Sequence, residues 1–152
     1  KKLPVVIARL FNTVGPRQTG QYGMVLPNFV QKALIGKSII IYGDGNQTRS
    51  FIHVSDAVDA MIKLMDKSEA VGEIFNIGTD KEISIKDLAY LVKEMTASNS
   101  DIEYISYDRA YGAGFEDMQR RMPDISKIKK LIDFSPKKNL RAIVQSVIDY
   151  YL

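Results

Sequence analysis

The sequence predicts an α/β fold in which short strands alternate with amphipathic helices. Three observations support this class. Short apolar runs rich in β-branched residues, Val5–Phe11 and Ile39–Ile41, indicate strands buried in a sheet. Between such runs, apolar residues recur at three- and four-residue spacing, which is typical of helices that pack on a sheet. Gly36, Gly72 and Gly78 separate these segments and indicate turns.

The expected strands, in chain order, are Val5–Phe11, Ser38–Tyr42, Ser50–Val54, Glu73–Ile77 and Ile102–Tyr107. The expected helices begin near Pro27, at Ser55 or Asp56, at Ser84, at Asp124 and at Asn139. The second helix is expected to run to about Lys67 and to bury Val58, Met61, Ile62 and Met65. Asp108–Met122 has two glycines and no periodicity, so it is predicted to be a long loop, a kind that is usually functional or disordered.

Composition restricts the possible functions. The chain has 152 residues, no cysteine and one histidine, so disulfides, zinc-thiolate sites and His-rich metal sites are not expected. The formal net charge of +3 is small and scattered, which argues against a nucleic-acid partner. The sequence contains no apolar run of about 18 residues, so we expect no membrane span, and we expect a cytoplasmic location because cysteine is absent.

The usual catalytic patterns are absent from this sequence. No tyrosine is followed four residues later by a lysine, so the chain lacks a Tyr-x-x-x-Lys acid/base pair. Gly43 and Gly45 lack a third glycine and precede a strand, which is the wrong context for a dinucleotide-binding fingerprint. No P-loop, serine nucleophile elbow or HExxH motif is present. We therefore predict no catalytic residue in this chain.

Two polar residues are placed for ligand binding. Asn12 follows the first strand, and ligands of open α/β sheets collect at the carboxyl ends of strands. Its amide can bind phosphate or hydroxyl groups, or it can cap the turn before Gly15. Arg49 follows a glycine turn and can make two hydrogen bonds to a phosphate. Alternatively, it can be a surface residue or pair with Asp44 or Asp56.

Other side chains give weaker signals. Tyr42 can stack on a base, although a tyrosine at a strand end is more often at the edge of a core. The loop residues Glu116 and Asp117 can accept the hydroxyls of a ribose or can simply be solvated. His53 alternates with apolar residues, so we expect a buried histidine with satisfied hydrogen bonds.

Four ordered motifs together resemble one enzyme family: Arg9-Leu-Phe-Asn-Thr-Val-Gly-Pro-Arg17, Tyr42-Gly-Asp-Gly-Asn-Gln-Thr-Arg-Ser-Phe-Ile-His-Val-Ser-Asp56, Phe75-Asn-Ile-Gly78 and Pro123-Asp-Ile-Ser-Lys127. The chain resembles the extended short-chain dehydrogenase/reductases that act on nucleotide sugars. These NAD-dependent enzymes include UDP-glucose 4-epimerases, dTDP-glucose 4,6-dehydratases and UDP-glucuronate decarboxylases. The resemblance covers nearly the whole chain.

The resemblance implies a role for each matching position. Asn12 and Arg49 would bind the diphosphate of a UDP- or dTDP-sugar. Val25, Ile40 and Tyr42 would enclose the base, and Asp117, together with Glu116, would reach the ribose. Leu10 and Phe11 would line the nicotinamide side of NAD through their backbone.

The chain also departs from the family. Related epimerases carry a second diphosphate arginine before the acidic pair, where this chain has Tyr111-Gly-Ala-Gly-Phe115, and Arg109, Arg120 or Arg121 could replace it. The glycine-rich NAD loop and the Tyr-x-x-x-Lys pair of the family's N-terminal portion are missing. Because the chain also opens directly on a strand, we expect it to be the C-terminal part of a Rossmann-like enzyme: the substrate-binding subdomain plus the last strands of the parallel sheet.

Two functional hypotheses follow. In the first, residues 1–152 form a single nucleotide-sugar-binding part of an NAD-dependent epimerase, dehydratase or decarboxylase, which acts as a homodimer when full-length. That enzyme would oxidise C4 of the sugar by hydride transfer to NAD, and this part alone would be inactive. In the second, the chain is a stand-alone module that binds nucleoside diphosphates or serves in assembly without catalysis. The sugar, the base and the reaction type stay open.

Overall fold

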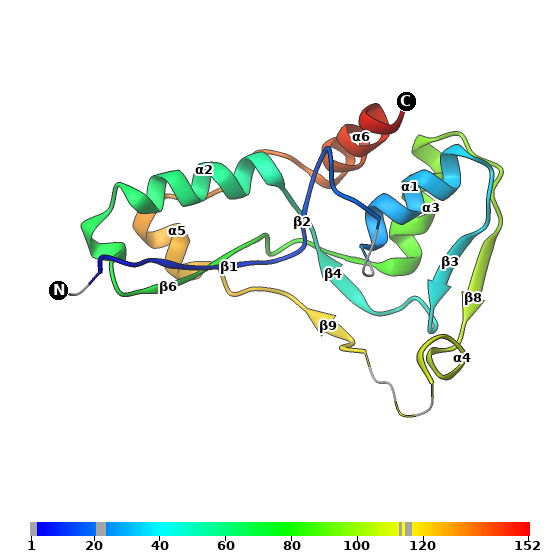
Figure 1. Ribbon diagram of the computed structural model, residues 1–152, viewed down its shortest axis with the longest axis horizontal. Helices are drawn as coiled ribbons and strands as arrows, with labels where there is room; N and C mark the ends of the chain where they lie inside the picture. Colours follow the sequence, from blue (N-terminus) through cyan, green and yellow to red (C-terminus); the bar gives the residue numbers. More distant parts are fainter. Residues whose placement is uncertain (1–2, 21–23, 113, 115–116) are drawn as a thin grey trace. The chain divides into compact units, whose positions relative to one another are not determined.

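The computed structural model describes residues 3–20, 24–112, 114 and 117–152 (Figure 1). The contacts between residues divide the chain into two compact units. The first consists of Lys1–Gly15, Ser50–Glu82 and Met122–Ile143. The second consists of Pro16–Arg49, Ile83–Arg121 and Val144–Leu152. Each unit is therefore assembled from three separate stretches of sequence.

The first unit combines parallel strand pairs with two helices. β1 (Ile7–Leu10) pairs in parallel with β6 (Ile74–Ile77), and β2 (Thr13–Val14) pairs in parallel with β5 (Ile52–His53). α2 (Val54–Met65) follows β5 directly, and the short 3-10 helix η1 (Ser68–Ala70) leads to β6. α5 (Ser126–Ile132) packs against both β6 and α2 (Figure 1). The parallel pairing is the one predicted for an α/β chain.

The burial of two elements differs from the prediction. α2 buries Ala57, Ala60 and Leu64, whereas Val58, Ile62 and Met65 are exposed. Both sets have helical spacing, but the two alanines allow a closer approach to the strands and to α5. The helix is also anchored by the buried carboxylate of Asp56, which accepts hydrogen bonds from the backbone N–H groups of Lys137 and Lys138 at 3.1 and 3.0 Å.

β1 was predicted to be a buried strand, and in the structure it is largely exposed. Ile7 and Leu10 keep 50% and 46% of their surface accessible. The strand is shorter than predicted, and its hydrogen-bonded partner is β6. An apolar, β-branched sequence favours a strand in any case, but burial requires neighbours that cover both faces.

The second unit contains a parallel strand pair covered by helices. β3 (Ile39–Tyr42) pairs in parallel with β8 (Ile102–Ile105). α1 (Val25–Leu34) and α3 (Ile85–Met95) pack against each other and against β3. A three-stranded sheet has the order β7 (Glu82–Ser84), β4 (Thr48–Ser50) and β9 (Arg120–Arg121). α6 (Leu140–Tyr151) ends the chain.

Helix starts follow the predicted capping chemistry at α3 and α6. The hydroxyl of Ser84 accepts a hydrogen bond from the N–H of Asp87 at 3.0 Å and so caps α3. The side chain of Asn139 accepts from the N–H of Ala142 at the start of α6. α2 and α5 differ. The cap of α2 is the imidazole of His53 and not Ser55 or Asp56. The N-cap of α5 is Ile125, although the carboxylate of Asp124 accepts a hydrogen bond from the N–H of Ser126 at 2.8 Å.

The segment Asp108–Met122 was predicted to be a loop throughout. In the structure it overlaps a short helix, α4 (Tyr107–Tyr111), and contains β9. β9 pairs in parallel with β4, so that Thr48 and Arg49 stand beside Arg120 and Arg121. Pairing between strands so distant in the chain leaves no local pattern of hydrophobicity, which explains why it was missed.

Candidate functional site

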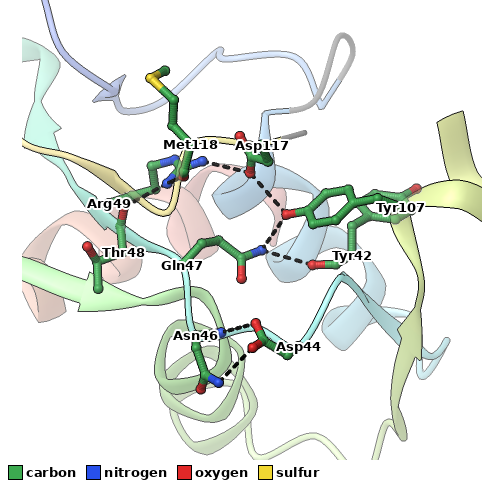
Figure 2. A network of polar contacts seen from close by, with 9 residues as sticks. All are labelled: Tyr42, Asp44, Asn46, Gln47, Thr48, Arg49, Tyr107, Asp117 and Met118. Atoms are coloured by element: carbon green, nitrogen blue, oxygen red, sulfur yellow. Dashed lines mark hydrogen bonds and ion pairs between the residues drawn. The ribbon is translucent and has the colours of Figure 1, made fainter. Parts of the chain in front are cut away.

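The glycine turn between β3 and β4 begins the site. Gly43 and Gly45 have φ angles of 74° and 77°, a conformation that residues with a Cβ rarely adopt. Between them, the carboxylate of Asp44 accepts hydrogen bonds from the backbone and side-chain amides of Asn46, both at 2.9 Å (Figure 2). These bonds lower the pKa of Asp44 below its usual value. The turn thus leads directly into β4, which carries Arg49.

Arg49 is held by three acceptors. Its Nη1 donates to the carbonyl oxygens of Thr48 and Met118, both at 2.8 Å, and its Nη2 donates to Oδ2 of Asp117 at 2.7 Å (Figure 2). The side chains of Arg49 and Asp117 are only 12% and 30% exposed. Arg49 therefore pairs with the acidic residue predicted for the ribose, and not with Asp44 or Asp56.

Two residues that the sequence did not reveal complete this network. The hydroxyl of Tyr107 donates to Oδ2 of Asp117 at 3.0 Å and accepts from Nε2 of Gln47 at 3.0 Å. The same amide of Gln47 also donates to the carbonyl oxygen of Tyr42 at 2.9 Å (Figure 2). Gln47 is only 5% exposed. A buried glutamine needs hydrogen-bond partners. The presence of a glutamine between the glycine turn and Arg49 was therefore the sequence signal that could have pointed to this network.

The ring of Tyr107 lies against the glycine turn. A Cβ placed on Gly43 would come within 2.6 Å of Cε2 of this ring, so a larger residue at that position would displace the ring. Gly43 therefore has two functions, because it provides the left-handed turn and also leaves room for the tyrosine that bonds Asp117.

The residues predicted to enclose the base lie on α1 and β3. Ile39 and Ile41 are fully buried, whereas Ile40 is half-buried and Tyr42 is 38% exposed. Because side chains alternate along a strand, Ile40 and Tyr42 share the more accessible face of β3. Val25 is half-buried at the first position of α1. Glu116 lies outside the described residues.

Asn12, Leu10 and Phe11 belong to the first unit. Asn12 has a φ of 31°, its Nδ2 donates to the carbonyl oxygen of Ser50 at 2.8 Å, and its own carbonyl oxygen accepts from the N–H of Ile52. The side-chain amide of Asn12 thus binds the backbone at the end of β4, and not the turn before Gly15. Leu10 ends β1, and Phe11, which is half-buried, donates its N–H to the carbonyl oxygen of Ile77.

The structure brings Arg49 and Asp117 into direct contact, and Gln47 and Tyr107 link the backbone of Tyr42 to Asp117. Of the three arginines considered for the second diphosphate position, Arg109 lies on α4, whereas Arg120 and Arg121 lie on β9 beside β4. A cavity of about 410 Å³ in the second unit, lined by Arg17, Gln31 and Tyr151 among others, contains none of the predicted site residues.

Two further properties concern metals and membranes. Within the described ranges, no group of three or more acidic or histidine side chains is arranged to hold a metal ion. In the same part of the chain, no helix has the length and apolar character needed to cross a membrane.

Comparison with known proteins identifies related sequences. Residues 1–78 match the profile of the "NAD dependent epimerase/dehydratase family". Over 150 residues the chain is 41% identical to a UDP-N-acetyl-alpha-D-glucosaminuronate decarboxylase of Bacillus cytotoxicus, with 98% of this chain and 46% of that protein covered. It is 37% identical to UDP-glucuronic acid decarboxylase 1 of Xenopus tropicalis over 147 residues, which cover 97% of this chain and 33% of that protein.

Solved structures agree in fold. The epimerase Mth375 of Methanothermobacter thermautotrophicus superposes with a TM-score of 0.87 at 29% identity, covering 98% of this chain and 43% of that one. A Bacillus cereus UDP-glucuronic acid 4-epimerase, in complex with UDP-glucuronic acid and NAD, gives 0.85 at 26% identity, covering 97% and 45%. The chain thus spans less than half the length of these relatives. It has their Rossmann-like α/β fold, and the chain belongs to the NAD-dependent epimerase/dehydratase family.

Proposed function

We propose that this chain is the nucleotide-sugar-binding part of an NAD-dependent epimerase, dehydratase or decarboxylase. The observation that carries this proposal is the contact between Arg49 and Asp117, which come from distant parts of the sequence and meet beside the glycine turn. A cation for phosphate and a carboxylate for ribose hydroxyls, side by side, match the chemistry of a nucleoside diphosphate.

The diphosphate would be bound by Arg49 and a second arginine. Arg121 stands opposite Arg49 in the parallel register of β4 and β9, and side chains at paired positions point to the same face of a sheet. This register favours Arg121 over Arg109 as the second phosphate ligand. The side-chain amide of Asn12 stays a proposed phosphate ligand of the first unit.

The base would lie against the accessible face of β3, formed by Ile40 and Tyr42, with Val25 on its other side. Uracil is favoured over thymine, because the relatives described above act on UDP-linked compounds by name. The ribose hydroxyls would be bound by Asp117 and Glu116.

The family depends on NAD. Leu10 and Phe11 fit one edge of an NAD site, since they stand at the carboxyl end of β1 and Leu10 is accessible. NAD would accept a hydride from the sugar, while the residues of this chain bind and orient the nucleotide. The sequence holds no Tyr-x-x-x-Lys pair, so we expect no turnover by this chain alone.

The exposed apolar surface of the first unit is consistent with a longer enzyme. Ile7 and Leu10 on β1, and Val58, Ile62 and Met65 on α2, are all accessible although they are large and apolar. Surfaces of this kind are usually covered by other protein. We propose that the NAD-binding part of the enzyme covers them, and that the complete enzyme is a homodimer.

The proposal is tested by calorimetric titration of the 152-residue chain with UDP, UDP-glucose and dTDP. Arg49→Ala should weaken UDP binding by about 2 kcal/mol or more, because a charged hydrogen-bond donor to the phosphate is lost. Arg141→Ala, which removes an exposed arginine from α6, should leave the affinity unchanged. Equal affinities of wild type and Arg49→Ala would refute the proposed binding mode.

A further inference from the structure

We propose that Asp117 determines the specificity of Arg49, so that the arginine binds phosphate groups attached to a nucleoside in preference to free pyrophosphate. This inference rests on the proposed function and assigns Asp117 a second role beyond binding ribose. In that role its carboxylate is an anion that competes with phosphate for Arg49.

The hydrogen bonds that Arg49 already makes limit how a phosphate can bind to it. A guanidinium group has five N–H donors, and three of those on Arg49 already point to Thr48, Asp117 and Met118. At most two donors are left for a ligand in this arrangement. A phosphate that needs more of the guanidinium group must take the place of Asp117.

The charges of Arg49 and Asp117 together weaken the binding of free pyrophosphate. Asp117 lies 2.7 Å from Arg49 and compensates its positive charge at a site where both side chains are largely shielded from water. An incoming pyrophosphate would therefore meet an arginine whose charge is already compensated and a nearby carboxylate that repels it. Free pyrophosphate has no hydroxyl groups that could bind this carboxylate in compensation.

A nucleoside diphosphate differs because it carries ribose hydroxyls. The contacts of Asp117 described above all go to Oδ2, and a carboxylate can accept further hydrogen bonds at its other oxygen. Ribose hydroxyls that bind Asp117 would compensate for its weakened bond to Arg49. The phosphate and the ribose would thus be recognised together.

Tyr107 is the positioning residue of this arrangement. Its hydroxyl donates to Oδ2, the same oxygen that Arg49 binds, and it is itself held by Gln47 and by the close approach of its ring to Gly43. Removal of this hydroxyl loosens Asp117 and leaves every charge unchanged. The Tyr107→Phe variant therefore separates positioning from charge.

The test measures the affinities of the 152-residue chain for UDP and for inorganic pyrophosphate at one fixed ionic strength. Asp117→Asn, which is nearly isosteric, should bind pyrophosphate about tenfold more tightly than wild type, because the repelling charge is gone. Its UDP affinity should stay equal or fall, so the preference for UDP decreases at least tenfold. Tyr107→Phe should shift the preference in the same direction by a smaller factor.

The matched control is Asp80→Asn, which removes one charge from an exposed ion pair with Lys129 in the first unit. This variant should leave the UDP-to-pyrophosphate ratio unchanged. If wild type binds UDP but Asp117→Asn and Tyr107→Phe leave pyrophosphate affinity unaltered, the competing role of Asp117 is overturned while the proposed function stands. If wild type binds neither UDP nor dTDP, the proposed function itself is contradicted, whatever pyrophosphate does.

Discussion

Gly43 connects the backbone of the turn with the side chains that bind Arg49. With its φ of 74°, a larger residue at this position would have a strained backbone, and the 2.6 Å approach of the Tyr107 ring to a Cβ position means that it would also displace that ring. Gly36 is a useful contrast, because its φ of 67° is similar but no atom lies within 4 Å of its Cβ position. A comparison of substitutions at Gly43 and Gly36 therefore separates the effect of backbone strain from the effect of displacing the Tyr107 side chain.

Both Gly43→Ala and Gly36→Ala should lower the free energy of unfolding by about 1 to 2 kcal/mol, through the strained backbone. Only Gly43→Ala should also weaken UDP binding, because it displaces Tyr107 and with it Asp117. Urea denaturation and UDP titration of both variants check this. Equal UDP affinities in the two variants would show that the position of Tyr107 has no influence on the site.

His53 is the only histidine and caps α2 in its neutral form. Its Nδ1 accepts a hydrogen bond from the N–H of Ser55 at 3.1 Å, which a protonated ring could not do. Burial lowers the pKa of His53 below its usual 6.5, and the charge of Lys138 lowers it further, whereas Asp56 acts in the opposite direction. The unfolded chain therefore binds this proton more readily than the folded chain.

The stabilisation by His53 should be fully present above its unfolded pKa of 6.5 and should be lost as the pH falls through the lower folded pKa. His53→Asn, which keeps a capping side chain but does not titrate, should abolish this dependence between about pH 7 and pH 5. His53→Ala should in addition cost about 1 kcal/mol at neutral pH, through loss of the cap. Urea denaturation at several pH values measures this dependence. If the free energy of unfolding of His53→Asn changes with pH as steeply as that of wild type, the assignment to His53 is contradicted.

At the scale of elements, strand and helix positions were largely predictable, but the buried face of α2 was not. The helix has two apolar stripes, and hydrophobicity alone favours the stripe with the larger residues. The structure buries the stripe containing Ala57 and Ala60, since their small side chains allow close packing. Which stripe is chosen depends on the neighbouring elements and on the hydrogen bonds of Asp56 to distant backbone groups, and the local sequence shows neither.

Leu64 and Met65 are adjacent in α2 and test this assignment. Leu64 is 1% exposed and Met65 is 80% exposed. Leu64→Ala should therefore destabilise the chain by about 2 to 5 kcal/mol, and Met65→Ala by a few tenths at most. Thermal or urea unfolding measures both, and the reverse order of the two effects would support the face expected from the sequence.

The candidate site, like the fold, could be predicted only in part from the sequence. Arg49 and Asp117 could be chosen from their motifs, because a glycine turn and an acidic loop have recognisable residue types. Their direct contact could not be predicted, since it depends on the pairing of β4 with β9 and on Tyr107. Asn12 was correctly placed after the first strand. In the structure its side-chain amide binds the carbonyl oxygen of Ser50, and its role toward phosphate stays a proposal.

At the scale of the whole molecule, the chain spans less than half the length of its relatives and folds into two units. In our proposal the described part binds the nucleotide, and the sequence has no Tyr-x-x-x-Lys pair. We therefore expect no NADH formation and no sugar conversion when the chain is incubated with NAD and UDP-sugars. Turnover by the purified wild-type chain that is lost in Arg49→Ala would contradict the division of labour proposed above.

The most direct test of the central claim compares UDP with uridine. If Arg49 binds the diphosphate, wild type should bind UDP more tightly than uridine, and Arg49→Ala should lose most of that difference while its affinity for uridine is unchanged. If the difference between UDP and uridine is the same in Arg49→Ala as in wild type, Arg49 does not bind the diphosphate and the site must lie elsewhere.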